Sequence, residues 1–254
     1  TIIKDNAKDS KLLFRTVDKL LQKNNDKYYP SAKNDEELAN SFADFFSTKI
    51  DNIRNGFINS HLEQYIFPGR TCSSSFSEFQ AVTEKDVMDL VTRSKIKACS
   101  LDPSPANIMK EYYCELVPVF KTIINLSLST GVMPDDQKTA LLKPLLKKPN
   151  ADFEQFCSFR PVSNLKFLSK LIEKSACLQL NKYLVNNSLH ESLQSAYKVG
   201  HSTETALLAI TDDVLLSLDR GENVFLVLLD LSAAFDTVSH SRLLWHSRYS
   251  FKMV

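Results

Sequence analysis

Hydrophobic positions recur at helical spacing in several stretches of the chain, and the clearest stretch is residues 163–185. Its apolar residues are three or four positions apart, as one face of an α-helix requires, and they are Leu168, Leu171, Ile172, Ala176, Leu180, Tyr183 and Leu184. Residues 35–54 carry a similar stripe that is rich in phenylalanine, made of Leu38, Phe42, Phe45, Phe46, Ile50 and Ile53. Both stretches are predicted to be helices that face a core.

Two further helices are predicted from the residues that begin and end them. Thr83 and Asp86 have the spacing of a capping box, which indicates a helix that starts after Thr83. Residues 107–129 form the second pattern. Pro118 predicts a kink within it, and Gly131 its end.

Later in the chain, a short strand and another helix follow each other closely. Residues 194–200, "QSAYKVG", have the composition of a short strand. Ser202 can cap a helix over residues 203–219, and Gly221 supplies the residue type that commonly ends a helix.

Two more apolar runs are short enough for strands. Residues 138–148 are apolar and basic and contain Pro144, which predicts a strand at the edge of a sheet. Residues 224–231, "VFLVLLDL", are apolar except for Asp230, which predicts a buried strand. With helices predominating, the predicted fold class is α+β.

Composition supports the helical prediction and adds one linker. The chain has only five glycines among 254 residues, well below the average usage of about 7%. Its 43% hydrophobic and 24% charged residues are ordinary for a globular protein. Residues 68–80 are rich in serine and contain Pro68-Gly69, so they are the best candidate for a linker.

Cysteine usage and hydropathy limit the kinds of site and the compartment. The five cysteines are odd in number and none has C-x-x-C spacing, so neither a zinc site nor a disulfide framework is expected. No apolar run approaches the roughly 18 residues of a membrane span. We therefore expect an intracellular protein, cytoplasmic or nuclear, without a membrane partner.

The net charge of +1 argues neither for nor against a nucleic-acid partner. Such a partner would have to be bound by a local basic patch. The densest group of basic residues is Lys138, Lys143, Lys147 and Lys148. A solvated lysine face and a surface that meets phosphates both fit this group.

Asp230 is the residue whose chemistry most needs an explanation. A carboxylate at the end of a buried strand is normally paired, bound to a metal or placed in an active site. Asp236 fits a turn or a helix cap. The pair Asp212-Asp213 lies within the predicted helix, on the face away from its apolar residues, and is expected to be solvated.

Five segments together resemble reverse transcriptases of non-LTR (LINE-type) retrotransposons, jockey-like ones especially. "LVLLDLSAAFDTVSH" resembles the first catalytic motif of the palm, and "FRPVSNLKFLSKLIEK" and "LQSAYKVGHSTETALL" resemble two motifs of the fingers. "SLDPSPANIMKE" resembles the segment before the fingers, and "LANSFADFFSTKI" the stretch between endonuclease and polymerase. The resemblance covers roughly residues 35–244 in the order of the family.

The resemblance implies an incomplete right-hand polymerase made of an N-terminal extension, the fingers and the first palm strand. Residues 1–70 correspond to a helical linker region between endonuclease and polymerase. Residues 71–134 correspond to the N-terminal extension, and residues 135–254 to the fingers and the truncated start of the palm.

The resemblance also assigns roles to single residues. In the family, the aspartate that matches Asp230 is catalytic and binds Mg²⁺, and the carbonyl of Leu231 completes a metal shell. Phe235 matches the bulky residue that rejects a 2′-hydroxyl. Lys198 stands where a basic residue reaches the incoming triphosphate, and Arg160 matches a basic residue near template or nucleotide.

The resemblance implies RNA-directed DNA polymerase activity, with template RNA, primer DNA and deoxynucleoside triphosphates as partners. The family's later palm motifs, including "x-A-D-D", and its thumb are absent from this sequence, and the resemblance stops near residue 245. We therefore do not expect catalysis by this chain alone. Two alternatives remain open, a non-catalytic module that binds RNA and a decayed open reading frame.

Overall fold

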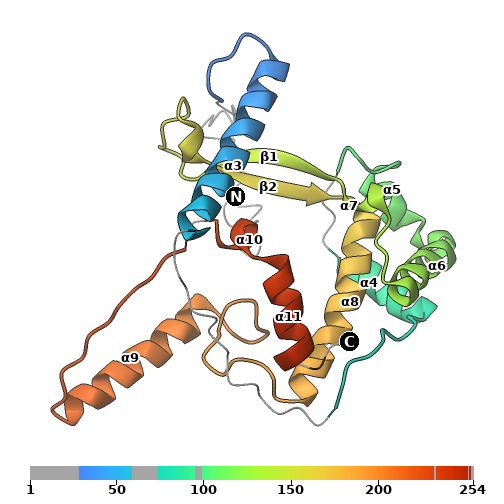
Figure 1. The fold of residues 1–254 in the computed structure, drawn as a ribbon. Coiled ribbons are helices and arrows are strands. Elements are labelled where there is room, and N and C mark those ends of the chain that lie inside the picture. The colour runs from blue at the N-terminus through green and yellow to red at the C-terminus, as the bar shows by residue number, and fades with distance from the viewer. Residues whose placement is uncertain (1–28, 59–73, 95–98, 232, 251, 253–254) are drawn as a thin grey trace, which may run out of the picture. The chain divides into compact units, whose positions relative to one another are not determined.

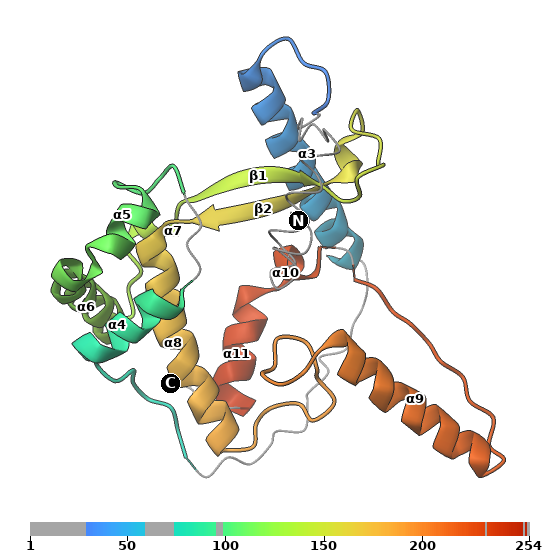
Figure 2. The ribbon, with the colours of Figure 1, turned by 180° about the vertical axis from the view of Figure 1, so that it is seen from behind.

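The computed structural model describes residues 29–58, 74–94, 99–231, 233–250 and 252. These residues form mostly helices and one two-stranded sheet, as Figures 1 and 2 show. The predicted α+β class with a predominance of helix is therefore confirmed. The described chain divides into two compact units. The smaller joins the residues up to Phe45 to Pro144–Pro161, and the larger joins Phe46–Lys143 to the residues from Val162 onward.

The described elements follow one another along the chain in the order given next. The helices and strands are α3 Asp35–Ile58, α4 Glu84–Arg93, α5 Ala106–Glu111, α6 Tyr113–Thr130, α7 Asp135–Lys138, β1 Ala140–Leu146, the 3₁₀ turn η1 Phe156–Ser158, β2 Phe159–Leu165, α8 Phe167–Asn186, α9 Thr203–Asp219, α10 Ala234–Thr237 and α11 His240–Ser250.

The core of the larger unit lies between α4, α6 and α8, which pack on one another. Each helix contributes the apolar face that its sequence pattern indicates. The buried residues are Val87, Leu90, Val91, Val117, Phe120, Ile124, Leu128, Phe167, Leu171 and Ile172, with Met109 of α5 beside them. Burial of such side chains stabilises the unit by about 1.5–3 kcal/mol each.

Helix α4 begins at the predicted capping box. The backbone N–H of Asp86 donates to the Thr83 hydroxyl at 3.2 Å, and the Thr83 N–H donates to the Asp86 carboxylate at 2.8 Å. These two bonds satisfy backbone donors that a helix start leaves free. The cap sets the register in which Val87, Leu90 and Val91 face the core.

The predicted helix over residues 107–129 is two helices in the structure. It breaks at Tyr112, between α5 and α6, and not at Pro118, which lies inside α6. Pro118 is near the start of α6, so its missing N–H removes one early hydrogen bond and the helix continues. The end is as predicted, because Gly131 has the left-handed φ of 67° that glycine adopts without strain.

Helix α8 starts at Phe167, four residues later than predicted, because residues 163–165 belong to β2. Its first turn is fixed by polar groups from other elements. The Phe167 N–H donates to the Asp102 carboxylate at 2.7 Å. The buried Lys166 ammonium pairs with Asp136 of α7, and the Ser169 hydroxyl donates to the Gln137 carbonyl at 2.8 Å.

The smaller unit is held together by aromatic rings. Phe42 of α3 meets Tyr29, Phe156 and Phe159 edge-on, with ring centroids 6.2, 4.9 and 5.1 Å away. Ser31 adds two hydrogen bonds to the Glu154 carboxylate, from its N–H at 2.9 Å and its hydroxyl at 3.0 Å. The predicted phenylalanine stripe of residues 35–54 is therefore a core face in its central part, where Phe42 and Phe46 are buried.

Strands β1 and β2 form a two-stranded sheet and run antiparallel (Figure 1). β1 lies within the predicted strand of residues 138–148 and includes Pro144. A two-stranded sheet leaves one edge of each strand open, so a proline without an N–H fits there.

Two predicted strands do not form. Residues 194–200 make turns, with positive φ at Tyr197 and Gly200. Residues 224–231 are not assigned to any strand and their side chains are exposed. A strand needs a neighbour that completes its hydrogen bonds, and within the described residues the paired strands are β1 and β2.

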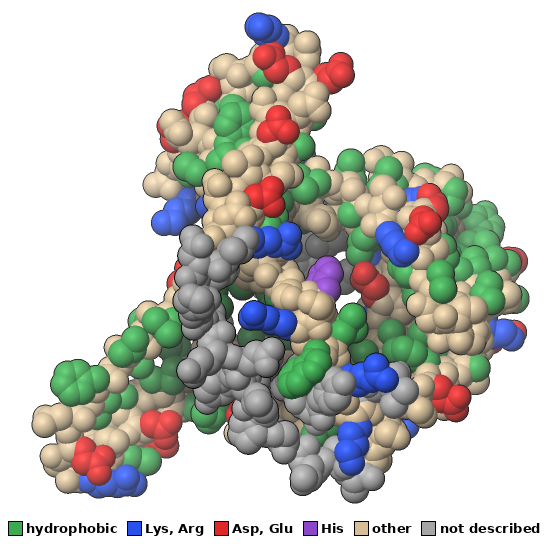
Figure 3. Space-filling model, viewed as in Figure 1, with side chains coloured by type: hydrophobic (Ala, Val, Ile, Leu, Met, Phe, Trp, Pro, Cys, Tyr) green, Lys and Arg blue, Asp and Glu red, His purple; other side chains and the backbone are tan. Residues whose placement is uncertain are grey.

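Helix α9 begins and ends where the sequence predicts. Ser202 and Thr205 exchange hydrogen bonds in a capping box, and Gly221 follows the helix with φ of 75°. Its apolar residues are nevertheless exposed, among them Leu207, Ile210 and Leu218, and Figure 3 shows hydrophobic side chains at the surface of α9. The apolar face of this helix therefore lies at the surface of the described structure.

Candidate functional site

Asp230 lies in the exposed segment that joins α9 to α10. Residues 222–231 have no regular secondary structure, and Asp230 and its neighbour Leu231 are exposed. The expectation of a buried carboxylate is therefore wrong, because residues 224–231 form no strand and pair with no strand among the described residues. In this arrangement the carboxylate is solvated and open to a ligand.

Phe235 is placed by α10, a short helix that starts just after Asp230. Ala233 precedes the helix with φ of 53°, a conformation that non-glycine residues adopt rarely. The Asp236 carbonyl at the end of this turn accepts a hydrogen bond from the Arg54 guanidinium at 3.1 Å. Asp236 thus lies inside the short helix α10, whereas the sequence predicts a turn or a helix cap at this position.

Lys198 is brought near Phe235 by its neighbour Tyr197. The rings of Tyr197 and Phe235 meet edge-on, with centroids 5.9 Å apart and an angle of 80° between their planes. Tyr197 has φ of 59°, and this left-handed residue bends the chain so that the loop of residues 194–200 turns at this point. Two predicted nucleotide-binding positions, Lys198 and Phe235, therefore lie on segments that touch.

Arg160 lies on β2 and is exposed. It belongs to the smaller unit, whereas Asp230, Phe235 and Lys198 belong to the larger one. Its position near template or nucleotide stays a prediction.

The four lysines of the predicted phosphate-facing patch are all exposed. Lys138 pairs with Asp135 at 2.8 Å, and Lys147 donates to the Cys157 carbonyl at 2.7 Å. The hydrogen bond from Lys138 also lowers the pKa of the Asp135 carboxyl. Lys138 and Lys143 lie in the larger unit and Lys147 and Lys148 in the smaller one.

The oxygen donors at Asp230 and Leu231 suit Mg²⁺, which prefers carboxylate and carbonyl oxygens and keeps few protein ligands. They amount to one carboxylate and one carbonyl. Within the part of the chain that the structure describes, no group of three or more His, Cys, Asp or Glu residues is arranged to hold a metal ion. The residues present could therefore supply part of the coordination shell of a magnesium ion.

Tyr197 is the residue of this region that the sequence did not single out. Its position directly before Lys198, in a segment already matched to a fingers motif, was the available signal. The ring contact with Phe235 depends on a bend of the chain, which a strand prediction for residues 194–200 excludes.

No helix in the described residues has the length and hydropathy to cross a bilayer.

No protein-family model matches the chain, but several known proteins are similar to it. The probable RNA-directed DNA polymerase from transposon BS of Drosophila melanogaster is 27% identical over 217 residues, which are 84% of this chain and 23% of that protein. The RNA-directed DNA polymerase from mobile element jockey of Drosophila funebris is 27% identical over 175 residues, which are 66% of this chain and 18% of that protein.

A third relative, the probable RNA-directed DNA polymerase from transposon X-element of Drosophila melanogaster, is 25% identical over 122 residues. The chain therefore spans less than a quarter of the length of these relatives. All three names describe the same activity in mobile elements. The resemblance seen in the sequence is confirmed: this chain is homologous to the RNA-directed DNA polymerases of Drosophila non-LTR retrotransposons such as jockey.

Proposed function

We propose that this chain is the N-terminal portion of a retrotransposon reverse transcriptase, comprising the fingers and the beginning of the palm. In the complete polymerase it takes part in RNA-templated nucleotidyl transfer to a primer. The observation that carries the proposal is the similarity to RNA-directed DNA polymerases over 84% of the chain. Template RNA, primer DNA and deoxynucleoside triphosphates are the partners proposed.

Each candidate residue has a proposed task in the polymerase. Asp230 and the Leu231 carbonyl hold Mg²⁺, which supplies Lewis-acid stabilisation of phosphate oxygens when it is bound. Phe235 presents an apolar ring to the sugar and rejects a 2′-hydroxyl by its bulk. Lys198 offers a point charge to the triphosphate, and Arg160 a planar guanidinium to template or nucleotide.

The contact between Tyr197 and Phe235 supports this division of tasks. A residue that meets the sugar and a residue that meets the triphosphate must lie within the length of one nucleotide. Because Tyr197 precedes Lys198 directly and touches Phe235 at 5.9 Å between centroids, the two segments are close enough for one nucleotide to reach both.

The isolated chain is proposed to be inactive. Two-metal nucleotidyl transfer uses metals about 4 Å apart, held by several carboxylates, and the sequence lacks the "x-A-D-D" segment that supplies them in the family. The purified chain should therefore not extend a primed RNA template with Mg²⁺ and deoxynucleotides. Extension above that of an Asp230→Ala control would contradict this part of the proposal.

A chimera tests the polymerase role directly. Residues 100–244 of this chain replace the matching segment of the jockey polymerase, and primer extension on RNA is measured. We expect extension that is lost in Asp230→Ala, and incorporation of ribonucleotides in Phe235→Val. A chimera that folds and binds RNA as the parent does, but whose extension does not depend on Asp230, would overturn the proposal.

A second candidate function is RNA binding without catalysis. The observation that favours it is that Lys138, Lys143, Lys147 and Lys148 are all exposed, while the segment of Asp230 is not assembled into a sheet. This candidate predicts RNA binding that is unchanged in Asp230→Ala and that falls when the lysines are neutralised.

A further inference from the structure

The segment before α4, residues 74–82, is bound along α6 and α8, and we name it the strap. The sequence predicts a linker over residues 68–80, yet the strap is bound to other parts of the chain along most of its length. Phe76, Phe79 and Val82 are half-buried, whereas the residues between them are exposed. Burial at every third residue is the period of a polyproline II helix, the form in which many extended peptides bind to proteins.

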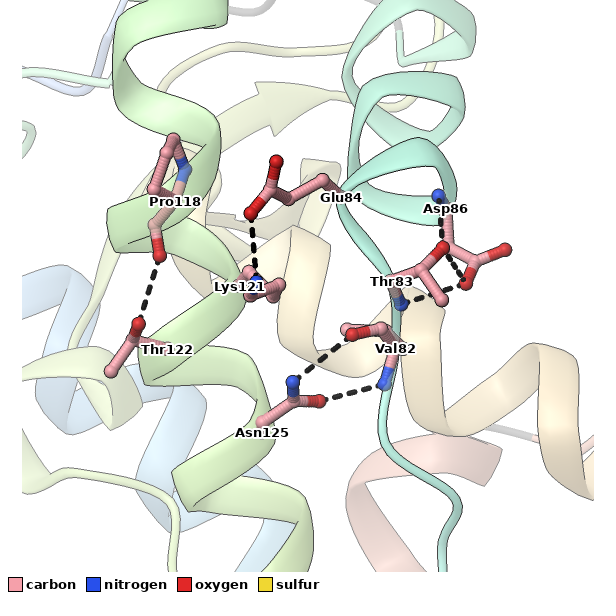
Figure 4. A network of polar contacts seen from close by, with 8 residues as sticks. All are labelled: Val82, Thr83, Glu84, Asp86, Pro118, Lys121, Thr122 and Asn125. Carbon is pink, nitrogen blue, oxygen red and sulfur yellow. Dashed lines mark hydrogen bonds and ion pairs between the residues drawn. The ribbon is translucent and has the colours of Figure 1, made fainter.

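Two side-chain amides hold the main chain of the strap. The Val82 N–H donates to the Asn125 side-chain oxygen at 2.7 Å, and the Asn125 amide donates back to the Val82 carbonyl at 3.0 Å (Figure 4). Gln179 repeats this geometry on Gln80, with distances of 2.7 and 2.9 Å. Each amide replaces the hydrogen bonds that a neighbouring strand would give.

Two polar residues of α8 and the residue that caps its C-terminus share this task along one side of the helix. Gln179, Tyr183 and Asn187 are spaced by four residues, which places them in a row. The Tyr183 hydroxyl donates to the Ser74 carbonyl at 3.0 Å, and the Asn187 side-chain oxygen accepts from the Ser74 hydroxyl at 2.6 Å. The Tyr183 ring also lies 5.4 Å from that of Phe76.

Most of these bonds go to backbone atoms, which every peptide possesses. Specificity is left to the Phe76 and Phe79 rings, which meet each other with centroids 5.1 Å apart. We propose that the row of Gln179, Tyr183 and Asn187 along α8 and its C-cap, completed by Asn125 on α6, is a receptor for an extended peptide main chain, and that residues 74–82 occupy it in cis and can be replaced in trans.

A labelled peptide with the sequence of residues 74–82 tests the proposal. The receptor is the full chain carrying Gln80→Pro, which removes the N–H that Gln179 accepts and so weakens the strap in cis. The matched control is Gln80→Ala, which keeps that N–H and changes only an exposed side chain. Fluorescence anisotropy should show binding to Gln80→Pro at least tenfold tighter than to the wild type or the control, because an attached strap competes at an effective concentration near millimolar.

A second test changes the peptide instead of the receptor. A peptide methylated on the nitrogens of Gln80 and Val82 should lose binding, whereas Ser77→Ala with Glu78→Ala should bind unchanged. Gln179→Ala in the receptor should also abolish binding. A peptide that fails to bind a folded Gln80→Pro chain, or a methylated peptide that binds equally well, overturns the proposal.

The wild-type chain gives a readout that does not depend on how the proline variant folds. Hydrogen exchange at the Gln80 amide should be slow, and a millimolar excess of the free peptide should accelerate it while core amides of α6 stay unchanged. An exchange rate at Gln80 that is insensitive to the peptide contradicts replacement in trans.

Discussion

The ring of Tyr197 meets the ring of Phe235 edge-on, with centroids 5.9 Å apart, across 38 positions of the sequence. Both rings are largely exposed, at 89% and 76%, so few other contacts hold either residue. The pair therefore links the loop that carries Lys198 to the turn that follows Asp230. An aromatic pair of this kind contributes about 0.5–1.5 kcal/mol.

Removal of either ring should free the loop of Lys198. In Tyr197→Ala, trypsin should cleave after Lys198 about two to ten times faster, in line with the free energy of an aromatic pair of about 0.5–1.5 kcal/mol. Phe235→Ala should have the same effect, and the double variant should add little because both changes remove one contact. Leu193→Ala, an equally exposed change in the same region, should leave the rate unaltered.

The capping box of α4 should make the free energy of unfolding depend on pH. Hydrogen bonds from the hydroxyl and then from the backbone N–H of Thr83 lower the pKa of the Asp86 carboxyl from its ordinary value. Because the pKa is lower in the folded state, the stabilisation is fully present above the unfolded pKa and is lost as pH falls through the folded one.

Asp86→Ala measures that contribution. Since Asp86 is exposed, we expect a loss of a few tenths to about 1 kcal/mol at pH 7. The difference from the wild type should vanish at pH values below the folded pKa. Urea unfolding at several pH values checks this, with Met88→Ala on the same helix as a change that does not titrate. A difference that stays constant into strong acid would count against the assigned cause.

Asn125 should matter more for stability than the ion pair beside it. Asn125→Leu leaves both the N–H and the carbonyl of Val82 without partners in a partly buried place, which costs roughly 1–3 kcal/mol. Lys121 lies one helical turn before Asn125 on α6 and pairs with Glu84 at 2.8 Å (Figure 4). Lys121→Met breaks this exposed ion pair, which contributes about 0–1 kcal/mol. Equal losses of unfolding free energy in the two variants would contradict this role of the hydrogen bonds between Asn125 and Val82.

The ion pair between Lys166 and Asp136 should respond unequally to the loss of its two members. The Lys166 side chain is 10% exposed and that of Asp136 is 74% exposed. Asp136→Ala leaves a buried ammonium unpaired and should cost roughly 1–3 kcal/mol. Lys166→Met removes the buried charge and leaves a solvated carboxylate, so its cost should be smaller. Thermal unfolding of both variants decides, and the reverse order would refute the argument.

Elements that depend on neighbouring residues could be predicted from the sequence. The capping box at Thr83, the cap at Ser202 and the glycine ends at Gly131 and Gly221 are all in place. Each of these signals acts over a few residues, so nothing elsewhere in the chain is needed to realise it.

Elements that depend on distant partners could not be predicted. Residues 224–231 have the composition of a buried strand, but composition does not state whether another strand lies beside them. The strap shows the opposite case, because a polar, serine-rich segment is fixed by amide side chains 43 and 99 positions away. In the candidate site, the residue types at Asp230, Phe235 and Lys198 could be read from motifs, whereas the Tyr197 contact required a bend that no short pattern indicates.

Binding to RNA should depend on salt through the exposed lysines. Each phosphate neutralised contributes about −0.7 to the slope of log K against log salt on single strands. Lys148 is exposed, and Lys147 is exposed although its ammonium also reaches the Cys157 carbonyl at 2.7 Å. We therefore expect weak binding with a modest negative slope. Lys147→Gln with Lys148→Gln should flatten that slope by roughly one unit or more, without a change in sequence preference.

Lys121→Gln is a matched control for this measurement, because Lys121 lies outside the cluster and pairs with Glu84. It should leave the slope unchanged. A solvated lysine face without a role in binding predicts no affinity at physiological salt. A binding curve that is flat across salt, or a slope that the double replacement does not alter, would show that Lys147 and Lys148 do not meet phosphates and would remove the support for an RNA-binding role of this cluster.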